Sequence, residues 1–171
     1  MNGMNIHLTS GTFDFLFKMK KKHLAESMIL MQNIDNAVLL HETTKSSVFN
    51  TPRSFQVLDS FGPLENRGYV VMNNIPVTEE ERPLFEYRLK NIKNLFQNLK
   101  GFLAIRILQP LKSDTYIVLT LWQNEKAYMD WEHSASYDMF MNEVEMNPSF
   151  KTAQLLIGSS YVTKYFIPEE K

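Results

Sequence analysis

The most regular pattern of hydrophobic and polar positions lies in the C-terminal half of the chain, after Gly68. Residues 69–77 form an apolar run that predicts a buried strand. Apolar residues then recur at spacings of four, three, four and three, which predicts one long helix with a buried stripe formed by Phe85, Leu89, Ile92, Phe96 and Leu99. Thr78 and Glu81 have the form of a capping box, but Pro83 indicates that the regular helix begins a turn later.

The pattern beyond Gly101 predicts two strands, two helices and a final strand. Residues 102–108 and 116–122 read as an antiparallel hairpin joined across residues 110–114. Residues 125–132 and 137–144 read as helices separated by Ser134-Ala135-Ser136, and residues 161–167 read as the last strand. The order strand, helix, strand, strand, helix, strand is that of an α+β ferredoxin-like domain.

The N-terminal half has a less regular pattern. Residues 4–9 read as extended, and residues 13–17 fit either a strand or a helix, of which we favour a short helix after Ser10-Gly11-Thr12. Residues 28–31 and 37–41 form a hairpin across Asn and Asp residues. The apolar residues of 55–61, which follow Pro52, predict a short helix that ends at Gly62-Pro63. We place the two units at residues 1–66 and 67–171.

Composition excludes several classes of function. Lys and Arg number 18 against 19 Asp and Glu, so no strong field attracts nucleic acid. Cysteine is absent, which removes disulfides and thiolate metal sites. No apolar run approaches the ~18 residues of a membrane-spanning helix. We therefore expect a cytoplasmic protein without a nucleic-acid partner or integral membrane association.

Two local features have both a structural and a functional interpretation. Residues 13–22 mix phenylalanines with lysines and could touch an anionic membrane surface, but a core-facing apolar side with a solvated lysine edge explains them more simply. The ten methionines could line an adaptable ligand cavity or fill the core. No nucleophile motif or His-x-x-x-His spacing indicates a hydrolase or a zinc site.

Three groups of residues carry a resemblance to a known family. The stretch GFLAIRILQPLKSDTYIVLTLWQNEKAYMDWEHSASY, from Gly101 to Tyr137, resembles the haem-degrading monooxygenases of the antibiotic-biosynthesis-monooxygenase family, especially its longer Bacillus form. VVMNNIPVTEEERPLFE continues this similarity. SGTFDFL, ILMQ and LLHETT resemble that long form and also the staphylococcal target of RNAIII-activating protein. The resemblance thus covers nearly the whole chain.

The resemblance implies an architecture. Short members of the family are dimers of the α-β barrel type, in which two ferredoxin-like sheets face each other and haem lies between a sheet and the helices of its own domain. In the long form the N-terminal half would supply the second sheet. We therefore expect a monomer with an eight-stranded barrel closed within one chain, which leaves no exposed sheet edge.

The resemblance also implies site residues. An Asn on the first strand of the catalytic domain lies near the iron-bound oxygen in the family, and Asn74 matches it by position. A Trp that buckles the porphyrin matches Trp131. The family's axial His, ten residues further on, corresponds to Met141, whose thioether is a softer and weaker ligand for ferric iron. Asn74 could instead satisfy local backbone groups, and Trp131 could simply pack the helix on the sheet.

His133 is the other candidate iron ligand near Trp131. On a continuous helix its side chain points about 200° away from that of Trp131, although the break at residues 134–136 could reorient it.

Three hypotheses for function follow. The first is oxidative haem degradation, which needs dioxygen and an external electron donor and releases iron. The second is a non-catalytic signalling or stress protein that binds a small ligand and has lost the haem ligand. The third is oxidation of a small aromatic substrate without a cofactor. Met141 favours the second and third hypotheses, whereas Asn74 and Trp131 favour the first.

Overall fold

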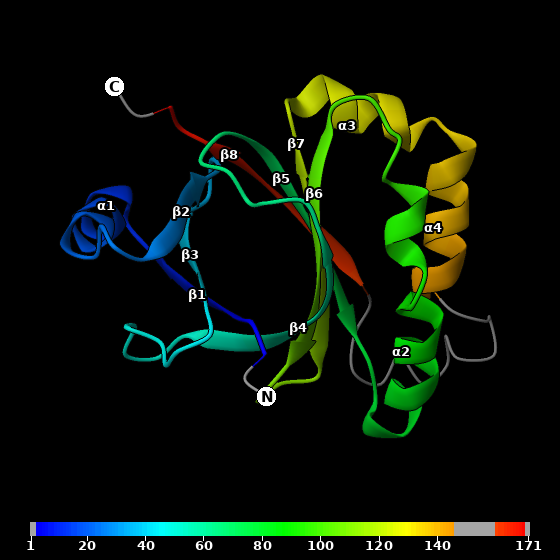
Figure 1. The fold of residues 1–171 in the computed structure, drawn as a ribbon, viewed down its shortest axis with the longest axis horizontal. Helices are drawn as coiled ribbons and strands as arrows, with labels where there is room; N and C mark the ends of the chain where they lie inside the picture. Colours follow the sequence, from blue (N-terminus) through cyan, green and yellow to red (C-terminus); the bar gives the residue numbers. More distant parts are fainter. Residues whose placement is uncertain (1–2, 146–159, 170–171) are drawn as a thin grey trace.

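Eight antiparallel strands close into one barrel in this computed structural model, which describes residues 3–145 and 160–169 of the chain. The strand order around the barrel is β1-β3-β2-β8-β5-β7-β6-β4. Figure 1 looks along the barrel, which appears as a ring of strands, with α1 outside one side and α2, α3 and α4 outside the other. Each half of the chain supplies four adjacent strands, so the predicted completion of an eight-stranded barrel by the N-terminal half is confirmed.

The N-terminal half contains β1 (Asn5–Gly11), α1 (Phe13–Lys22), β2 (Ser27–Gln32), β3 (Ala37–Thr43) and β4 (Arg53–Phe61). The predicted helix after Thr12 is confirmed, because the Thr12 hydroxyl accepts the backbone N–H of Phe15 and caps α1. The predicted hairpin is also confirmed. The side chain of Asn33 accepts the backbone N–H groups of Asp35 and Asn36 and fixes its turn.

The predicted short helix at residues 55–61 is wrong, because this segment is the strand β4. It pairs with β1 on one side and β6 on the other, and Phe55 points into the barrel. A bulge between Val57 and Asp59 adds one residue to the strand. That extra residue, Leu58, interrupts the alternation and produces a spacing that imitates one face of a helix.

The C-terminal half contains β5 (Gly68–Pro76), η1 (Glu79–Glu81), α2 (Arg82–Leu89), η2 (Ile92–Leu95), β6 (Phe102–Pro110), β7 (Thr115–Trp122), α3 (Glu125–Glu132), α4 (Ala135–Glu145) and β8 (Tyr161–Ile167). The order of its strands and helices is the predicted ferredoxin-like order. The expected helix start near Pro83 is confirmed, since this proline lies in the first turn of α2.

The predicted single helix through residues 85–99 is wrong in its continuity but right in its buried stripe. The segment divides into α2 and the short 3₁₀ helix η2. Asn91, Asn94 and Asn98 are poor helix formers, and they interrupt the regular hydrogen bonding. Of the predicted stripe, Phe85, Leu89, Ile92 and Phe96 are buried, and Leu99 is partly buried against the same cluster.

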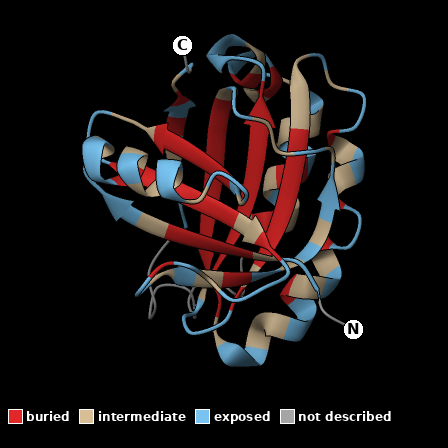
Figure 2. Cartoon of the chain, turned by 60° about the vertical axis from the view of Figure 1, so that its left-hand side comes forward, coloured by how far each residue is buried: buried red, intermediate tan, exposed pale blue. Residues whose placement is uncertain are grey.

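The core consists of three apolar clusters. Figure 2 colours buried residues red, and most of them lie on the strands. One fills the barrel, a second lies between β5–β7 and the helices α2 to α4, and a third lies under α1. The two halves of the chain meet along two junctions of unequal length. β4 and β6 share six registered residue pairs, whereas β2 and β8 share one, between Gln32 and Phe166.

Candidate functional site

The two asparagines of β5 point to opposite faces of the sheet. Val71 and Ile75 pack against the helices, whereas Val70 and Met72 pack inside the barrel. Because side chains alternate along a regular strand, Asn73 faces the helices and Asn74 faces the barrel interior. Asn74, predicted at the oxygen site beside Trp131, therefore lies on the other face of the sheet from that tryptophan.

Asn74 is held firmly inside the barrel. It is 2% exposed, and its Nδ2 donates to the carbonyls of Met72 and Tyr161, at 3.1 and 3.2 Å, and to the hydroxyl of Thr163 at 3.2 Å. The residue also lines a small cavity of about 110 Å³ at one end of the barrel. The alternative interpretation of Asn74 as a residue that satisfies backbone groups thus describes its contacts well.

Trp131 lies at the centre of an aromatic cluster on the helix side of the sheet. Asn124 caps α3, which carries this residue, by accepting the backbone N–H of Ala127 at 2.9 Å. The Trp131 rings lie 4.8, 5.3 and 5.4 Å from those of Phe96, Trp122 and Phe140. Trp131 is 4% exposed, so neighbouring groups cover most of its ring, and it also lines a surface pocket of about 310 Å³ with Leu99 and Ser134.

The break between α3 and α4 is fixed by hydrogen bonds. Trp131 Nε1 donates to the Ser136 hydroxyl at 3.1 Å, and that hydroxyl donates to the Leu95 carbonyl at 2.7 Å. The Ser134 hydroxyl donates to the Trp131 carbonyl at 2.6 Å. These contacts tie both helices to η2 and fix the direction in which α4 leaves the turn.

Met141 and His133, the two proposed iron ligands, occupy different environments. Met141 is partly buried and packs against the same apolar cluster as Trp131. His133 is exposed, and its Nδ1 lies 2.8 Å from the Met129 carbonyl of the preceding turn. The structure thus brings Trp131 and Met141 to one cluster, and it places Asn74 and His133 elsewhere.

Asn73 is the polar residue of β5 that sequence reasoning missed. It is buried on the helix side, and its side chain has no hydrogen-bond partner among the described residues. Asn73 pairs with Val118, four residues along β7 from Trp122, so it lies roughly 13 Å from the aromatic cluster along the strand. Side chains alternate between the two faces of the sheet from Val71 to Ile75, and this alternation could have shown from the sequence that Asn73 faces the helices.

Three buried tyrosines supply the phenol groups near the helices. Burial raises the pKa of Tyr69 to about 12, and the carboxylate of Glu125 adds to this effect. Burial also raises the pKa of Tyr116, whose hydroxyl donates to Glu86, and the pKa of Tyr128. All three phenols therefore stay protonated near neutral pH and act as hydrogen-bond donors, not as bases.

The described residues on the helix side do not fit a haem group. Phe96, Trp131 and Phe140 occupy the space between the sheet and the helices. None of the four histidines of the chain lies there, because His133 is exposed and the other three belong to the N-terminal half. The iron would thus lack an imidazole, and the porphyrin would lack room without displacement of buried rings.

The remaining buried histidines lie on the outer face of the N-terminal strands. His7 and His41 are paired across β1 and β3, with ring centroids 6.1 Å apart. His7 Nδ1 lies 2.7 Å from the Ser54 hydroxyl, and His41 Nε2 lies 2.8 Å from a Glu26 carboxylate oxygen. This row of polar groups is on the opposite side of the molecule from Trp131.

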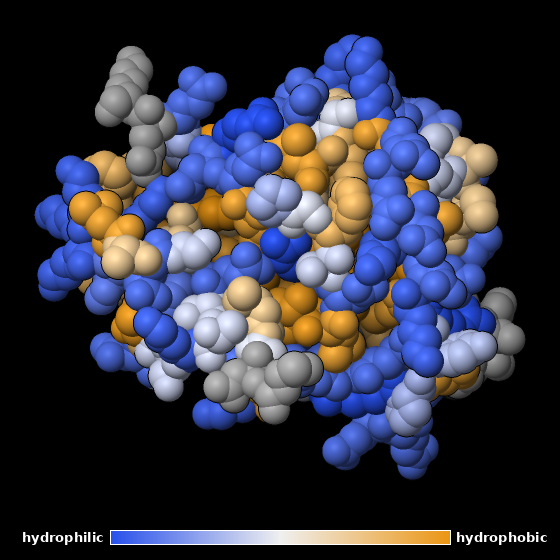
Figure 3. Space-filling view, viewed as in Figure 1, coloured by the Kyte–Doolittle hydropathy of each residue, from blue (hydrophilic) through white to orange (hydrophobic). Residues whose placement is uncertain are grey.

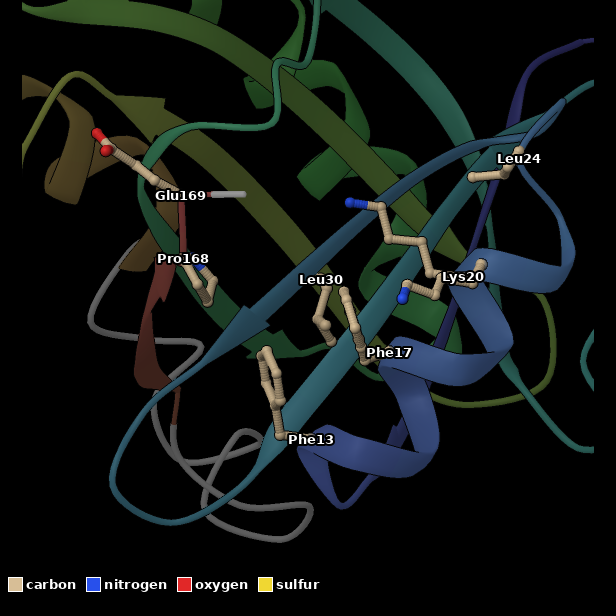
Figure 4. A pocket seen from close by; sticks show the side chains of 8 residues that line it. Phe13, Phe17, Lys20, Leu24, Leu30, Pro168 and Glu169 are labelled. Carbon is tan, nitrogen blue, oxygen red and sulfur yellow. The ribbon is translucent and has the colours of Figure 1, made fainter. Parts of the chain in front are cut away.

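The lysine-rich and aromatic stretch of α1 forms one wall of a surface groove of about 390 Å³. Figure 4 shows Phe13 and Phe17 of α1 facing Leu30 of β2, with Pro168 on the other side.

Leu16 is fully buried, whereas Phe15 is exposed. Lys20 donates to Asn66 at 3.2 Å, and the ammonium of Lys21 lies over the Phe17 ring. The core-facing apolar side agrees with the simpler interpretation of this stretch.

Comparisons with known proteins agree with this architecture. Residues 68–143 match the family described as "Antibiotic biosynthesis monooxygenase". The chain is 26% identical over 167 residues to the Staphylococcus epidermidis protein named "Signal transduction protein TRAP", and the match covers 98% of this chain and 99% of that protein.

Two solved structures have the same fold. One is described as a major regulator of staphylococcal pathogenesis, with a TM-score of 0.83, 23% identity, and coverage of 96% of this chain and 99% of that one. The other is the heme-degrading enzyme LmHde from Listeria monocytogenes, with a TM-score of 0.75, 21% identity, and coverage of 96% and 99%.

Within the described ranges 3–145 and 160–169, no helix has the length and apolar character needed to cross a bilayer. The matched segment contains most of the ferredoxin-like half, including Trp131 and Met141. Residues 68–143 of this chain are therefore similar to the antibiotic biosynthesis monooxygenase family.

Proposed function

We propose that this chain is a non-catalytic signal transduction protein of the TRAP type, and that it does not degrade haem. The observation that carries the proposal is the aromatic cluster of Phe96, Trp122, Trp131 and Phe140, which fills the space between the sheet and its helices. The near full-length similarity to the Staphylococcus epidermidis protein supports it.

The packing energy of the aromatic cluster opposes the insertion of a porphyrin between the sheet and the helices. Burying one large apolar side chain stabilises the fold by about 1.5–3 kcal/mol. A porphyrin would have to displace Phe140 and separate Trp131 from Phe96, and each of these rings is almost completely buried. Without an imidazole at position 141, iron coordination would offset little of that cost.

Haem degradation with dioxygen and an external electron donor is the second candidate. Its support is the position of Trp131 in the helix after the third strand of the domain, together with Asn73 on the same face of the sheet. The shared fold with LmHde is consistent with it. Cofactor-free oxidation of a small aromatic substrate remains the third prediction, and no contact in the structure favours it.

A haem titration followed at the Soret band tests the proposal. The variants are wild type, Met141→His, Met139→His and the double variant Met141→His with Phe140→Ala. Met139 is 55% exposed on the same helix, so Met139→His is the matched control for adding an imidazole outside the cluster.

We expect wild type and Met141→His to bind haem no better than Met139→His, because the space for the porphyrin is filled. Only the double variant, in which Phe140 is truncated, should gain a histidine-ligated spectrum. Saturable haem binding by wild type, with loss of the Soret band on addition of ascorbate, would contradict the proposal and favour the second candidate. Asn73→Ala, with Asn74→Ala alongside it, would then show which asparagine contributes to turnover.

A further inference from the structure

The cavity inside one end of the barrel has the character of a small binding site. Its walls are residues of β1, β3, β4, β5 and β8 together with Asn36 of the β2–β3 turn, and its mouth is formed by exposed residues that include Arg53. Leu8, Val38 and Met72 form the apolar part, and Arg53, Asn74 and Tyr165 are prominent among the polar lining groups. Figure 3, in the view along the barrel, shows apolar residues gathered around the middle of one face of the molecule, with hydrophilic residues among them.

Arg53 gives this cavity a positive charge. It is the only charged residue that lines the cavity, and no carboxylate pairs with it among the described residues. Its guanidinium lies 5.5 Å from the centre of the Phe55 ring, a contact that leaves the N–H groups free to bind an acceptor. A guanidinium beside an apolar cavity favours a carboxylate ligand.

Arg53 is exposed, whereas Arg106, a buried arginine of the barrel, shows how the fold neutralises such a charge where solvent is excluded. Arg106 Nε donates to Glu42 at 2.7 Å, and Arg106 Nη1 donates to the Gly62 carbonyl at 2.7 Å. Arg106 is 6% exposed, and its Nε and Nη1 both donate to oxygen atoms of the protein. Arg53 lacks an equivalent internal anion, so the two arginines differ in what they leave for a ligand.

Asn74 offers an acceptor at the same cavity. Its Nδ2 donates to three oxygens, and this arrangement fixes the orientation of the amide. The opposite atom, Oδ1, receives no hydrogen bond from any described residue, and it is not one of the fully buried atoms without a partner, so solvent reaches it from the cavity side. An amide oxygen of fixed orientation at a cavity wall can accept a hydrogen bond from a ligand or water that carries an O–H or N–H group.

The cavity volume limits the size of the ligand. A volume of about 110 Å³ holds roughly three or four water molecules, at ~30 Å³ for each. We propose that this end of the barrel binds a small 2-hydroxycarboxylate. Its carboxylate pairs with Arg53, its hydroxyl donates to Asn74 Oδ1, and its carbon atoms contact Leu8, Val38 and Met72. The site is on the opposite face of the sheet from the aromatic cluster, so it does not rest on the proposed function.

NMR titration of the ¹⁵N-labelled full chain with lactate tests this site, in a buffer free of carboxylates. Lactate should shift the side-chain amide signals of Asn74 and the Nε–H signal of Arg53. Arg53→Gln, which keeps the length and loses the charge, should weaken lactate binding at least tenfold. Arg67→Gln is the matched control, because Arg67 pairs with Glu65 on the surface and does not line the cavity.

Two further ligands separate the contributions of the carboxylate and the hydroxyl. Propionate lacks the hydroxyl and should bind several-fold more weakly than lactate, and 1,2-propanediol lacks the charge and should not bind. The proposal is overturned if wild type shows no localised shifts with lactate, or if Arg53→Gln binds lactate as well as Arg67→Gln does. Equal affinity for lactate and propionate would overturn the assigned role of Asn74. None of these outcomes depends on haem binding.

Discussion

At the scale of single residues, the buried histidines His7 and His41 form a pair of polar side chains on the N-terminal strands. His7 Nε2 and His41 Nδ1 are both buried without a hydrogen-bond partner among the described residues. Burial lowers the pKa of His7, and the neighbouring His41 lowers it further. The folded state therefore favours the neutral form of His7.

This pKa shift predicts that acid destabilises the protein. Because the pKa of His7 is lower in the folded state than its unfolded value of 6.5, the unfolded chain binds more protons below that pH. The contribution of His7 to stability is thus fully present above pH 6.5 and is lost as the pH falls towards the folded pKa. The urea concentration at the midpoint of unfolding should therefore decrease as the pH is lowered from 7.5 to 5.5.

Two variants test the origin of that decrease. His7→Gln should flatten the dependence on pH in this window, because the group that titrates is removed. Asn98→Gln, at an exposed residue without a titratable group, should leave the slope of wild type unchanged. An identical slope in His7→Gln and wild type would assign the effect to other groups.

At this scale, the sequence predicted which residue types belong to the candidate site better than it predicted the direction in which each side chain points. Trp131 and Met141 lie on one cluster although they belong to different helices, α3 and α4. The two adjacent asparagines of β5 have the same chemistry, so only the strand register shows which one faces the helices. The family resemblance selected Asn74 by position, and the structure places that side chain in the barrel.

At the scale of elements, the buried stripe on α2 and η2 was predictable from the sequence although the helix was not continuous. Burial depends on the spacing of apolar residues, and a 3₁₀ turn changes that spacing only slightly. β4 was not predictable for the opposite reason. Its bulge adds one residue, and this shifts the alternation on which recognition of a strand depends.

Ile92→Ala tests the contribution of the stripe to stability. Ile92 is 1% exposed and packs in the cluster between the sheet and the helices. Truncation should leave a cavity and lower the free energy of unfolding by about 2–5 kcal/mol. Urea denaturation provides the measurement. Ile34→Ala is the control, because Ile34 is fully exposed in the β2–β3 turn and its truncation should change little. Equal losses in the two variants would disagree with the assigned face.

At the scale of the whole molecule, the closed barrel was predicted by the resemblance and not by the pattern of the N-terminal half alone. That half gave only three recognisable strands, and an eight-stranded barrel needs a fourth. The boundary between residues 66 and 67 stays a prediction. Both halves contribute to one barrel core, so each buries apolar surface that the other would expose if it were alone.

Barrel closure within one chain predicts a monomer. The N-terminal strands cover the face that a separate ferredoxin-like domain would bury by dimerising, and every strand has a partner on both sides. Light scattering at micromolar concentration should give a mass near 20 kDa. A stable species of twice that mass would show that another surface associates.

The unequal junctions between the two halves determine where the barrel opens first. β2 and β8 are joined by one registered residue pair and by a hydrogen bond from Asn33 to the Lys164 carbonyl, whereas β4 and β6 are joined along most of their length. Amide protons at the edges of β2 and β8 should therefore exchange faster with solvent than those of β5 and β7. Opening there frees two complementary strand edges at once. At high protein concentration, the open form of one molecule can pair its β2 edge with the β8 edge of another, which makes this junction the route to strand exchange between copies.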